Sequence, residues 1–276
     1  MVSACFFGVL LFSPESPAAS LSLPLRNILM GIAMGLTAVA IIKSRWGQRS
    51  GAHFNPAVTL TFLRLGKVSR ADALFYILFQ FAGGLAGVRL SWYLLGDLLA
   101  GMEVGFVVTV PGEYGAGAAF AAEAVISFVM MTTILFASSA ASFVRLTPIF
   151  AGTLVAFYIA IESPVSGMSM NPARTFASAA VADDWRSWWV YFTAPPVAML
   201  AAAEFFVRTR GLKNVLCAKL DHFGRTRCIF NCEFSRSFNC RDAEAESLTT
   251  QSLSSNGVAE RSSPPVRIGG EESLYD

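Results

Sequence analysis

The chain has 276 residues, of which 54% are hydrophobic and only 14% carry a charge, and its formal net charge at pH 7 is +2. Soluble domains carry about 25% charged residues, so this composition excludes an ordinary water-soluble enzyme. The near-neutral balance shows no charge pattern typical of nucleic-acid binding. Because residues 208–276 hold almost half of the charged side chains on a quarter of the length, we expect a membrane domain over residues 1–207 and a polar, partly disordered tail over residues 208–276.

Five apolar runs approach the length of about 20 residues that crosses a bilayer as a helix: Leu25–Ile42, Ala71–Leu95, Ala116–Ala137, Thr147–Glu162 and Ser187–Val207. A shorter run, Ala4–Phe12, ends where Pro14 and Pro17 break the helix. A signal-peptide core is one alternative for this run, but no basic residue precedes it. We expect it to be the end of a first spanning helix whose beginning is absent from this chain, which makes six spans.

Charged residues alternate between the two sides of these runs. One side carries basic residues between the first two full spans: Lys43, Arg45, Arg49, Arg64, Lys67 and Arg70. The opposite connections carry acidic residues: Asp97, Glu103, Glu113, Asp183 and Asp184. Basic loops face the cytoplasm in membrane proteins, so we expect a multi-pass protein of the plasma or inner membrane with a cytoplasmic C-terminus.

An internal repeat relates the two halves of the chain. Residues 50–60 recur as residues 166–176, and each copy contains the same triplet: Asn55-Pro56-Ala57 and Asn171-Pro172-Ala173. Asn is a favoured helix N-cap and Pro suits the first helical turn, so each triplet predicts the start of a helix too short to span. Since three spans separate the copies, they enter from opposite sides, as in inverted-repeat transport folds. The N-termini of two re-entrant half-helices are therefore expected to meet near the midplane.

On these two motifs, each in a Ser-Gly-x-x-x-Asn-Pro-Ala context and the second followed by Arg174, the chain resembles the aquaporin family (major intrinsic proteins) over about residues 4–207. The resemblance implies an all-α membrane fold: six transmembrane helices, the first short or truncated here, and two re-entrant half-helices. It implies a pore in each subunit of a homotetramer, and no enzyme activity. The side-chain amides of Asn55 and Asn171 would orient a central water so that proton relay along the pore is interrupted.

The resemblance also implies a selectivity constriction. Arg174 resembles the family's constriction arginine, a barrier to cations, and an Arg in an apolar membrane segment is functional by default. The other constriction positions fall on Met168, on Met34 or Gly35, and on one residue from Phe157 to Ile159.

Two further residues match structural positions of the family. Glu123 resembles a buried glutamate that holds the backbone of the re-entrant loop that follows it. The matching residue of the first repeat would lie in the absent start of the first helix, which leaves the packing of the first half open. His53 resembles a loop histidine near the cytoplasmic mouth, either hydrogen-bonded within the loop or sensitive to pH.

The constriction differs from that of water-selective members, because the span Thr147–Glu162 lacks their histidine. Thr175, Ala179 and the pair Tyr191-Phe192 nevertheless resemble the water branch of the family more than the glycerol branch. We expect passive conduction of water and of small uncharged solutes such as glycerol, ammonia or metalloid acids, with no cofactor and no metal ion in the channel.

Two other functions compete with this interpretation. A coupled secondary transporter would need a titratable or ion-coordinating residue beside its substrate, and between the motifs we find only Asn, apolar residues and Arg174. A non-conducting or structural aquaporin-like protein would follow from the incomplete first helix.

The tail contains several potential metal ligands: Cys217, His222, Cys228, Cys232 and Cys240. The spacing of Cys228 and Cys232 fits zinc ligands. The simpler interpretation, which we favour, is a set of reduced cytosolic thiols in a loose tail.

Overall fold

The computed structural model describes residues 1–140, 142–222 and 228–234, and every regular element in this part of the chain is a helix. Five of the described helices are long and apolar enough to cross a membrane: α2 (Leu23–Lys43), α5 (Arg70–Leu95), α7 (Gly115–Ser138), α8 (Thr147–Ser166) and α10 (Trp188–Arg210). A shorter apolar helix, α1 (Val2–Phe12), precedes them. These bounds lie close to the predicted spans, so the predicted all-α membrane fold is confirmed.

Two short helices follow the repeated motifs. They are α4 (Pro56–Arg64) and α9 (Pro172–Ala182), and each begins at Pro with Asn as its N-cap. The loop before each helix turns through a matching pair of left-handed residues: Gly51-Ala52 and Gly167-Met168. Glycine adopts this conformation without strain, whereas a residue with a Cβ atom rarely does. The repeat in the sequence is therefore also a repeat in the backbone.

The remaining described elements are connections. Their bounds are α3 (Arg45–Ser50), α6 (Asp97–Ala100) and four 3₁₀ turns at Pro17–Ser20, Gly105–Val107, Val144–Leu146 and Leu212–Asn214.

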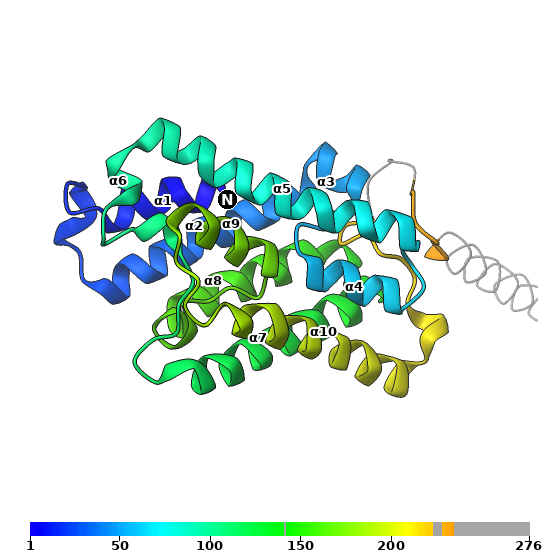
Figure 1. Cartoon of the computed structure of the whole chain (residues 1–276). Coiled ribbons are helices and arrows are strands. Elements are labelled where there is room, and N and C mark those ends of the chain that lie inside the picture. The colour runs from blue at the N-terminus through cyan, green and yellow to red at the C-terminus, as the bar shows by residue number, and fades with distance from the viewer. Residues whose placement is uncertain (141, 223–227, 235–276) are drawn as a thin grey trace, which may run out of the picture. The chain divides into compact units, whose positions relative to one another are not determined.

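The helix contacts follow the inverted repeat. Within the first half α1 packs against α2 and α5, and within the second half α7 packs against α8 and α10. The two halves interlock, because α4 packs against α10, the last span of the second half, and α9 packs against α5, the last span of the first. Figure 1 shows both pairs side by side. Each half-helix is thus held by the other repeat.

The two halves also meet where α2 crosses α8. A Cβ atom at Gly35 would strike the carbonyl oxygen of Gly152, and a Cβ atom at Gly152 would strike that of Gly35. Small residues let helix backbones approach closely in membranes, where packing rather than hydrophobic exclusion holds helices together. Gly35 is therefore a packing residue between helices.

We predict that Gly35→Ala destabilises the protein, because the new methyl group overlaps a backbone atom that cannot move alone. Overpacking of this kind costs about 1–3 kcal/mol, and thermal unfolding in detergent measures the loss. Gly83→Ala in α5 is the matched control, since nothing lies within 4 Å of a Cβ atom there. Equal stability of the two variants would contradict the close crossing.

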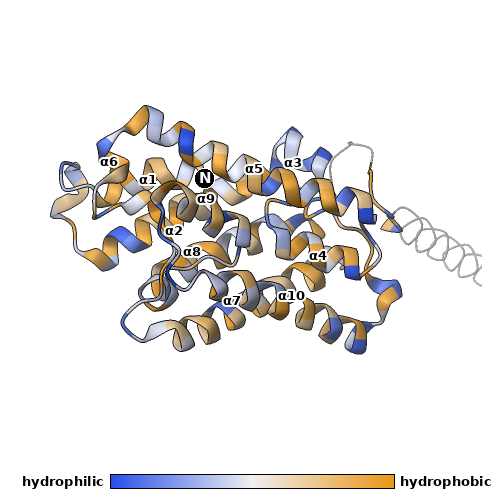
Figure 2. Ribbon diagram, viewed as in Figure 1, coloured by the Kyte–Doolittle hydropathy of each residue, from blue (hydrophilic) through white to orange (hydrophobic). Residues whose placement is uncertain are grey.

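The outer surface of the spanning helices is apolar. Large side chains such as Leu36, Phe79, Val125 and Val197 are all more than half exposed. Figure 2 shows hydrophobic residues along the length of these helices and many hydrophilic ones at helix ends and in connections. Water would disfavour such a surface, whereas a bilayer accommodates it.

The described chain beyond α10 packs against the helices. Val215, Ala218 and Leu220 are buried in the same cluster as Phe62 of α4 and Ile134 of α7. The helices and the segment that packs on them belong to one compact unit, Met1–Cys232. The rest of the predicted tail, residues 235–276 with Cys240, lies outside the described residues.

Candidate functional site

The two Asn-Pro-Ala motifs touch each other. Nδ2 of Asn55 donates a hydrogen bond of 2.7 Å to the carbonyl oxygen of Met170, the residue before Asn171. Nδ2 of Asn171 donates one of 2.8 Å to the carbonyl oxygen of Phe54, the residue before Asn55. This reciprocal pair brings the N-termini of α4 and α9 to one place, although more than a hundred residues separate them in the chain.

In both asparagines the side-chain oxygen caps the helix that follows, while the side-chain nitrogen bonds to the opposite loop. Oδ1 of Asn55 accepts from the backbone N–H of Ala57 at 2.9 Å, and Oδ1 of Asn171 accepts from those of Ala173 and Arg174 at 3.0 and 3.3 Å. These are N-cap contacts. A primary amide carries two N–H groups, so each side chain keeps one donor beyond its bond to the opposite loop. Two such donors, at the positive ends of two helix dipoles, can bind the oxygen of a neutral polar molecule.

Glu123 of α7 holds the loop before α9. Its side chain is fully buried. Oε1 accepts from the hydroxyl of Ser166 at 2.9 Å and from the backbone N–H of Ser169 at 2.6 Å, and Oε2 accepts from the backbone N–H of Met170 at 2.7 Å. Charge-assisted bonds of this kind are among the stronger hydrogen bonds. The carbonyl that receives Asn55 therefore belongs to a residue anchored by Glu123.

The loop before α4 is held by a different set of contacts. Nε2 of Gln80 donates to the carbonyl oxygen of His53 at 2.8 Å and to the hydroxyl of Thr59 at 3.0 Å. Nε2 of His53 lies 2.8 Å from the carbonyl oxygen of Ala218, so this nitrogen is the protonated one and its N–H donates a hydrogen bond to that oxygen. Burial lowers the pKa of His53 to about 4. The ring is therefore neutral near pH 7, which favours the hydrogen-bonded over the pH-sensitive alternative for this histidine.

A tyrosine supports each loop in the same way. The hydroxyl of Tyr76 donates to the carbonyl oxygen of Ser50 at 2.7 Å, and that of Tyr191 donates to the carbonyl oxygen of Ser166 at 2.5 Å. Ser50 and Ser166 begin the two copies of the repeat. The repeat predicts no role for Tyr76 or Gln80, because both residues lie outside it. The one feature of the sequence that points to a role for these two residues is that they are polar side chains within a predicted span.

Arg174 lies in the first turn of α9. Its side chain is half-buried, and Nη1 is buried without a hydrogen-bond partner among the described residues. An unpaired buried guanidinium nitrogen is costly unless it meets water or a solute. Met168, also predicted for the constriction, is buried in the loop that leads to the same helix.

The remaining constriction candidates lie partly in the packed interior and partly on the outer face of α8. Met34 is partly buried, and its sulfur lies 3.9 Å from the hydroxyl of Ser3 in α1. Phe157 is 54% exposed and shares the outer face of α8 with Ile149 and Ile161. Ile159 lies on the opposite face and packs against the core. Phe157 therefore lies on a different face from the other candidates. Gly35, the alternative to Met34, lies in the contact between α2 and α8.

Comparison with known proteins gives consistent matches. The profile of the family described as Major intrinsic protein matches residues 5–206. Aquaporin-4 of Rattus norvegicus is 31% identical over 216 residues, which cover 74% of this chain and 65% of that protein. Aquaporin NIP1-2 of Arabidopsis thaliana is 34% identical over 185 residues, which cover 66% of this chain and 62% of that protein. The chain thus spans just under two thirds of the length of these relatives.

A solved structure shares the fold. The X-ray structure of the aquaglyceroporin from Plasmodium falciparum superposes with a TM-score of 0.57 at 15% identity, covering 74% of this chain and 89% of that one. At this identity the match supports the helical architecture alone.

Proposed function

This chain belongs to the major intrinsic protein family, the aquaporins, and from that premise we propose that it is a passive membrane channel. Water and small uncharged solutes such as glycerol, ammonia or metalloid acids are its permeants, and ions and protons are excluded. The reciprocal hydrogen bonds of Asn55 and Asn171 are the observation that carries this proposal. With each Oδ1 used as an N-cap, each of the two side chains keeps one N–H donor and no acceptor. Both donors lie where the two half-helices meet.

The two asparagine donors explain how water passes without protons. A water molecule that accepts a hydrogen bond from each amide has both of its own hydrogens directed away, toward its neighbours in the pore. It cannot accept a proton from one neighbour and pass another on, because its lone pairs are occupied. The positive ends of the α4 and α9 dipoles add an electrostatic barrier to cations.

The constriction that we propose has one charged donor and three apolar walls. Arg174 is the donor, and Met168, Met34 and Ile159 are the walls. Phe157 is not included in this constriction, because its side chain lies on the outer face of α8. Without a histidine donor, such a constriction discriminates less strongly against solutes less polar than water.

We place the protein in the plasma or inner membrane as a homotetramer. The exposed apolar side chains of the spanning helices supply surface for lipid and for neighbouring subunits. The side that carries Arg45, Arg49 and the end of α10 faces the cytoplasm, in keeping with the positive-inside rule.

Stopped-flow light scattering of proteoliposomes tests the function. Vesicles with the purified protein should shrink in an osmotic gradient several-fold faster than empty vesicles, and re-swelling in glycerol measures the second permeant. Permeability equal to that of empty vesicles would contradict a channel. A proton current driven by a solute gradient would instead indicate coupled transport.

A thiol placed in the constriction should make permeation sensitive to mercurials. In Met168→Cys, a mercurial should block most of the water permeability, because the bulky adduct fills a narrow apolar passage. Phe157→Cys is the matched control and should be unaffected, since that side chain lies on the outer face. Wild type is measured first to account for native cysteines, and block of both variants alike would contradict our assignment.

A further inference from the structure

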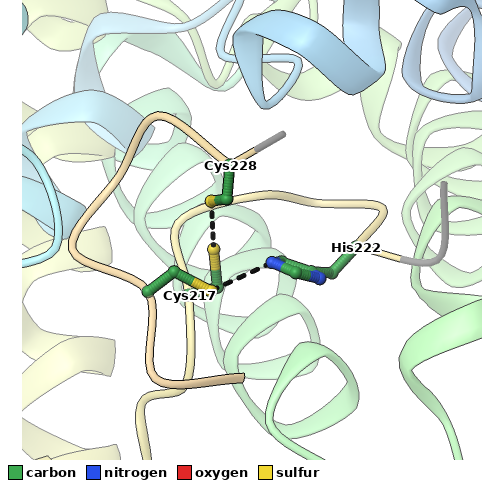
Figure 3. Close-up of side chains that lie close together, drawn as sticks. Cys217, His222 and Cys228 are labelled. Carbon is green, nitrogen blue, oxygen red and sulfur yellow. Dashed lines mark hydrogen bonds between the residues drawn. The ribbon is translucent and has the colours of Figure 1, made fainter. Parts of the chain in front are cut away.

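Four potential metal ligands converge in the segment that follows α10. They are Cys217, His222, Cys228 and Cys232, and one ligand atom from each lies within 4.8 Å of all the others. The sulfur atoms of Cys217 and Cys228 are 3.4 Å apart, and Nε2 of His222 is 3.0 Å from the sulfur of Cys232. Figure 3 shows the side chains of Cys217, His222 and Cys228 pointing toward one another.

The number, type and spacing of these ligands match one ion in particular. Zinc takes four ligands in a tetrahedron, and three thiolates with one imidazole are among its common structural sets. With Zn–S bonds of about 2.3 Å, a tetrahedron places sulfur atoms about 3.8 Å apart. The distance between Cys217 and Cys228 falls a few tenths of an ångström short of this value, so small side-chain movements would admit the ion.

The backbone around the cluster suits a thiolate. The N–H of Lys219 lies 3.5 Å from the sulfur of Cys217, which is buried. Donors of this kind stabilise negative charge on a metal-bound sulfur. None of the four described cysteines forms a disulfide.

We propose that Cys217, His222, Cys228 and Cys232 bind a structural Zn²⁺ ion. Binding displaces one proton from each of the three thiols, and neutral His222 donates the lone pair of a ring nitrogen. The four ligands complete a tetrahedron and leave no position open for a substrate, so the role of the ion is structural.

The segment closed by this ion braces both ends of the first half-helix. Before α4, the ring of Phe230 stacks on His53 at a centroid distance of 5.5 Å, and the N–H of Leu220 donates to the carbonyl oxygen of Gly51. After α4, Asn231 donates from its side chain to the carbonyl of Gly66 at 2.9 Å and from its backbone to that of Lys67 at 3.1 Å. The ion therefore holds this segment against the loops before and after α4. The loop before α4 positions Asn55.

Metal analysis of the purified full-length protein tests the site. The protein is isolated without chelators under reducing conditions and its zinc is measured by mass spectrometry. We expect about one zinc per chain in wild type and close to none in Cys228→Ser and Cys232→Ser. Cys5→Ser is the control, because Cys5 lies in α1 outside the cluster, and it should keep its zinc. Wild type without stoichiometric zinc overturns the proposal.

Two further readouts do not depend on permeation. Co²⁺ exchanged into wild type should show the visible absorption bands of a tetrahedral thiolate site, and a six-coordinate spectrum would contradict the ligand set. A zinc chelator should lower the thermal unfolding temperature of wild type and leave that of Cys228→Ser unchanged. An equal shift in both proteins would show that the chelator acts elsewhere and would overturn a structural role for zinc at this site.

Discussion

Replacing Arg174 with alanine is expected to let protons or small cations enter the channel. One elementary charge about 4 Å from a passing cation opposes it by about 4 kcal/mol at an effective dielectric constant of 20, which corresponds to roughly a thousandfold in its partition. Even a fraction of that effect is measurable as a cation-dependent change of pH inside vesicles. Water permeability should persist, because both asparagines remain.

Two arginine variants make this test specific. Arg174→Lys keeps the positive charge and should still exclude cations. Arg89→Ala removes an arginine from an exposed position of α5 and should change nothing. If Arg174→Ala excludes cations as well as wild type does, the side chain is not the barrier.

The second large effect is expected at Glu123. In Glu123→Leu, the hydroxyl of Ser166 and the N–H groups of Ser169 and Met170 lose their acceptor in a fully buried place. Each unsatisfied buried donor costs about 1–3 kcal/mol, so the total loss is about 3 kcal/mol or more, a large part of the stability of an ordinary protein. Thermal unfolding in detergent should show a markedly lower midpoint, and water permeability should fall because the carbonyl that receives Asn55 is displaced.

A surface glutamate provides the comparison. Glu204 pairs with Arg64 at 2.7 Å, and the two side chains are 42% and 57% exposed. Ion pairs exposed to this degree contribute about 0–1 kcal/mol. Glu204→Gln should therefore unfold close to wild type. A Glu123→Leu protein that is equally stable would mean that water replaces the lost acceptor.

Much of the architecture follows from patterns that the sequence repeats. Apolar runs of spanning length mark the five long helices, since a bilayer admits little else. The Asn-Pro pairs mark the starts of α4 and α9, because capping by Asn and the fixed backbone of Pro are local effects. The inverted arrangement of the two copies then follows from the odd number of spans between them.

Side-chain direction could not be predicted in the same way. Phe157 and Ile159 are two residues apart on α8, and an error of that size turns a side chain to the opposite face of the helix. Gly35 and Met34 differ by one residue, and only the crossing with Gly152 shows that Gly35 serves packing. Such assignments depend on which face each helix turns toward its partners.

The contacts around the first loop depend on residues far apart in the chain. Ala218 and Phe230 reach His53 across more than 160 residues, and their segment reads as an ordinary polar tail. The spacing of Cys228 and Cys232 was a visible signal, but their approach to Cys217 and His222 depends on how the segment folds. Sequence periodicity carries no information about such long-range closure.

The unequal support of the two re-entrant loops makes them differ in chemical accessibility. Glu123 reaches its loop from within the helix bundle, where its side chain is fully buried. The opposite loop is contacted by the segment that carries the four proposed zinc ligands. With zinc bound at the proposed site, a chain built from two similar halves has one half whose support a chelator in solution can remove and one half whose support it cannot.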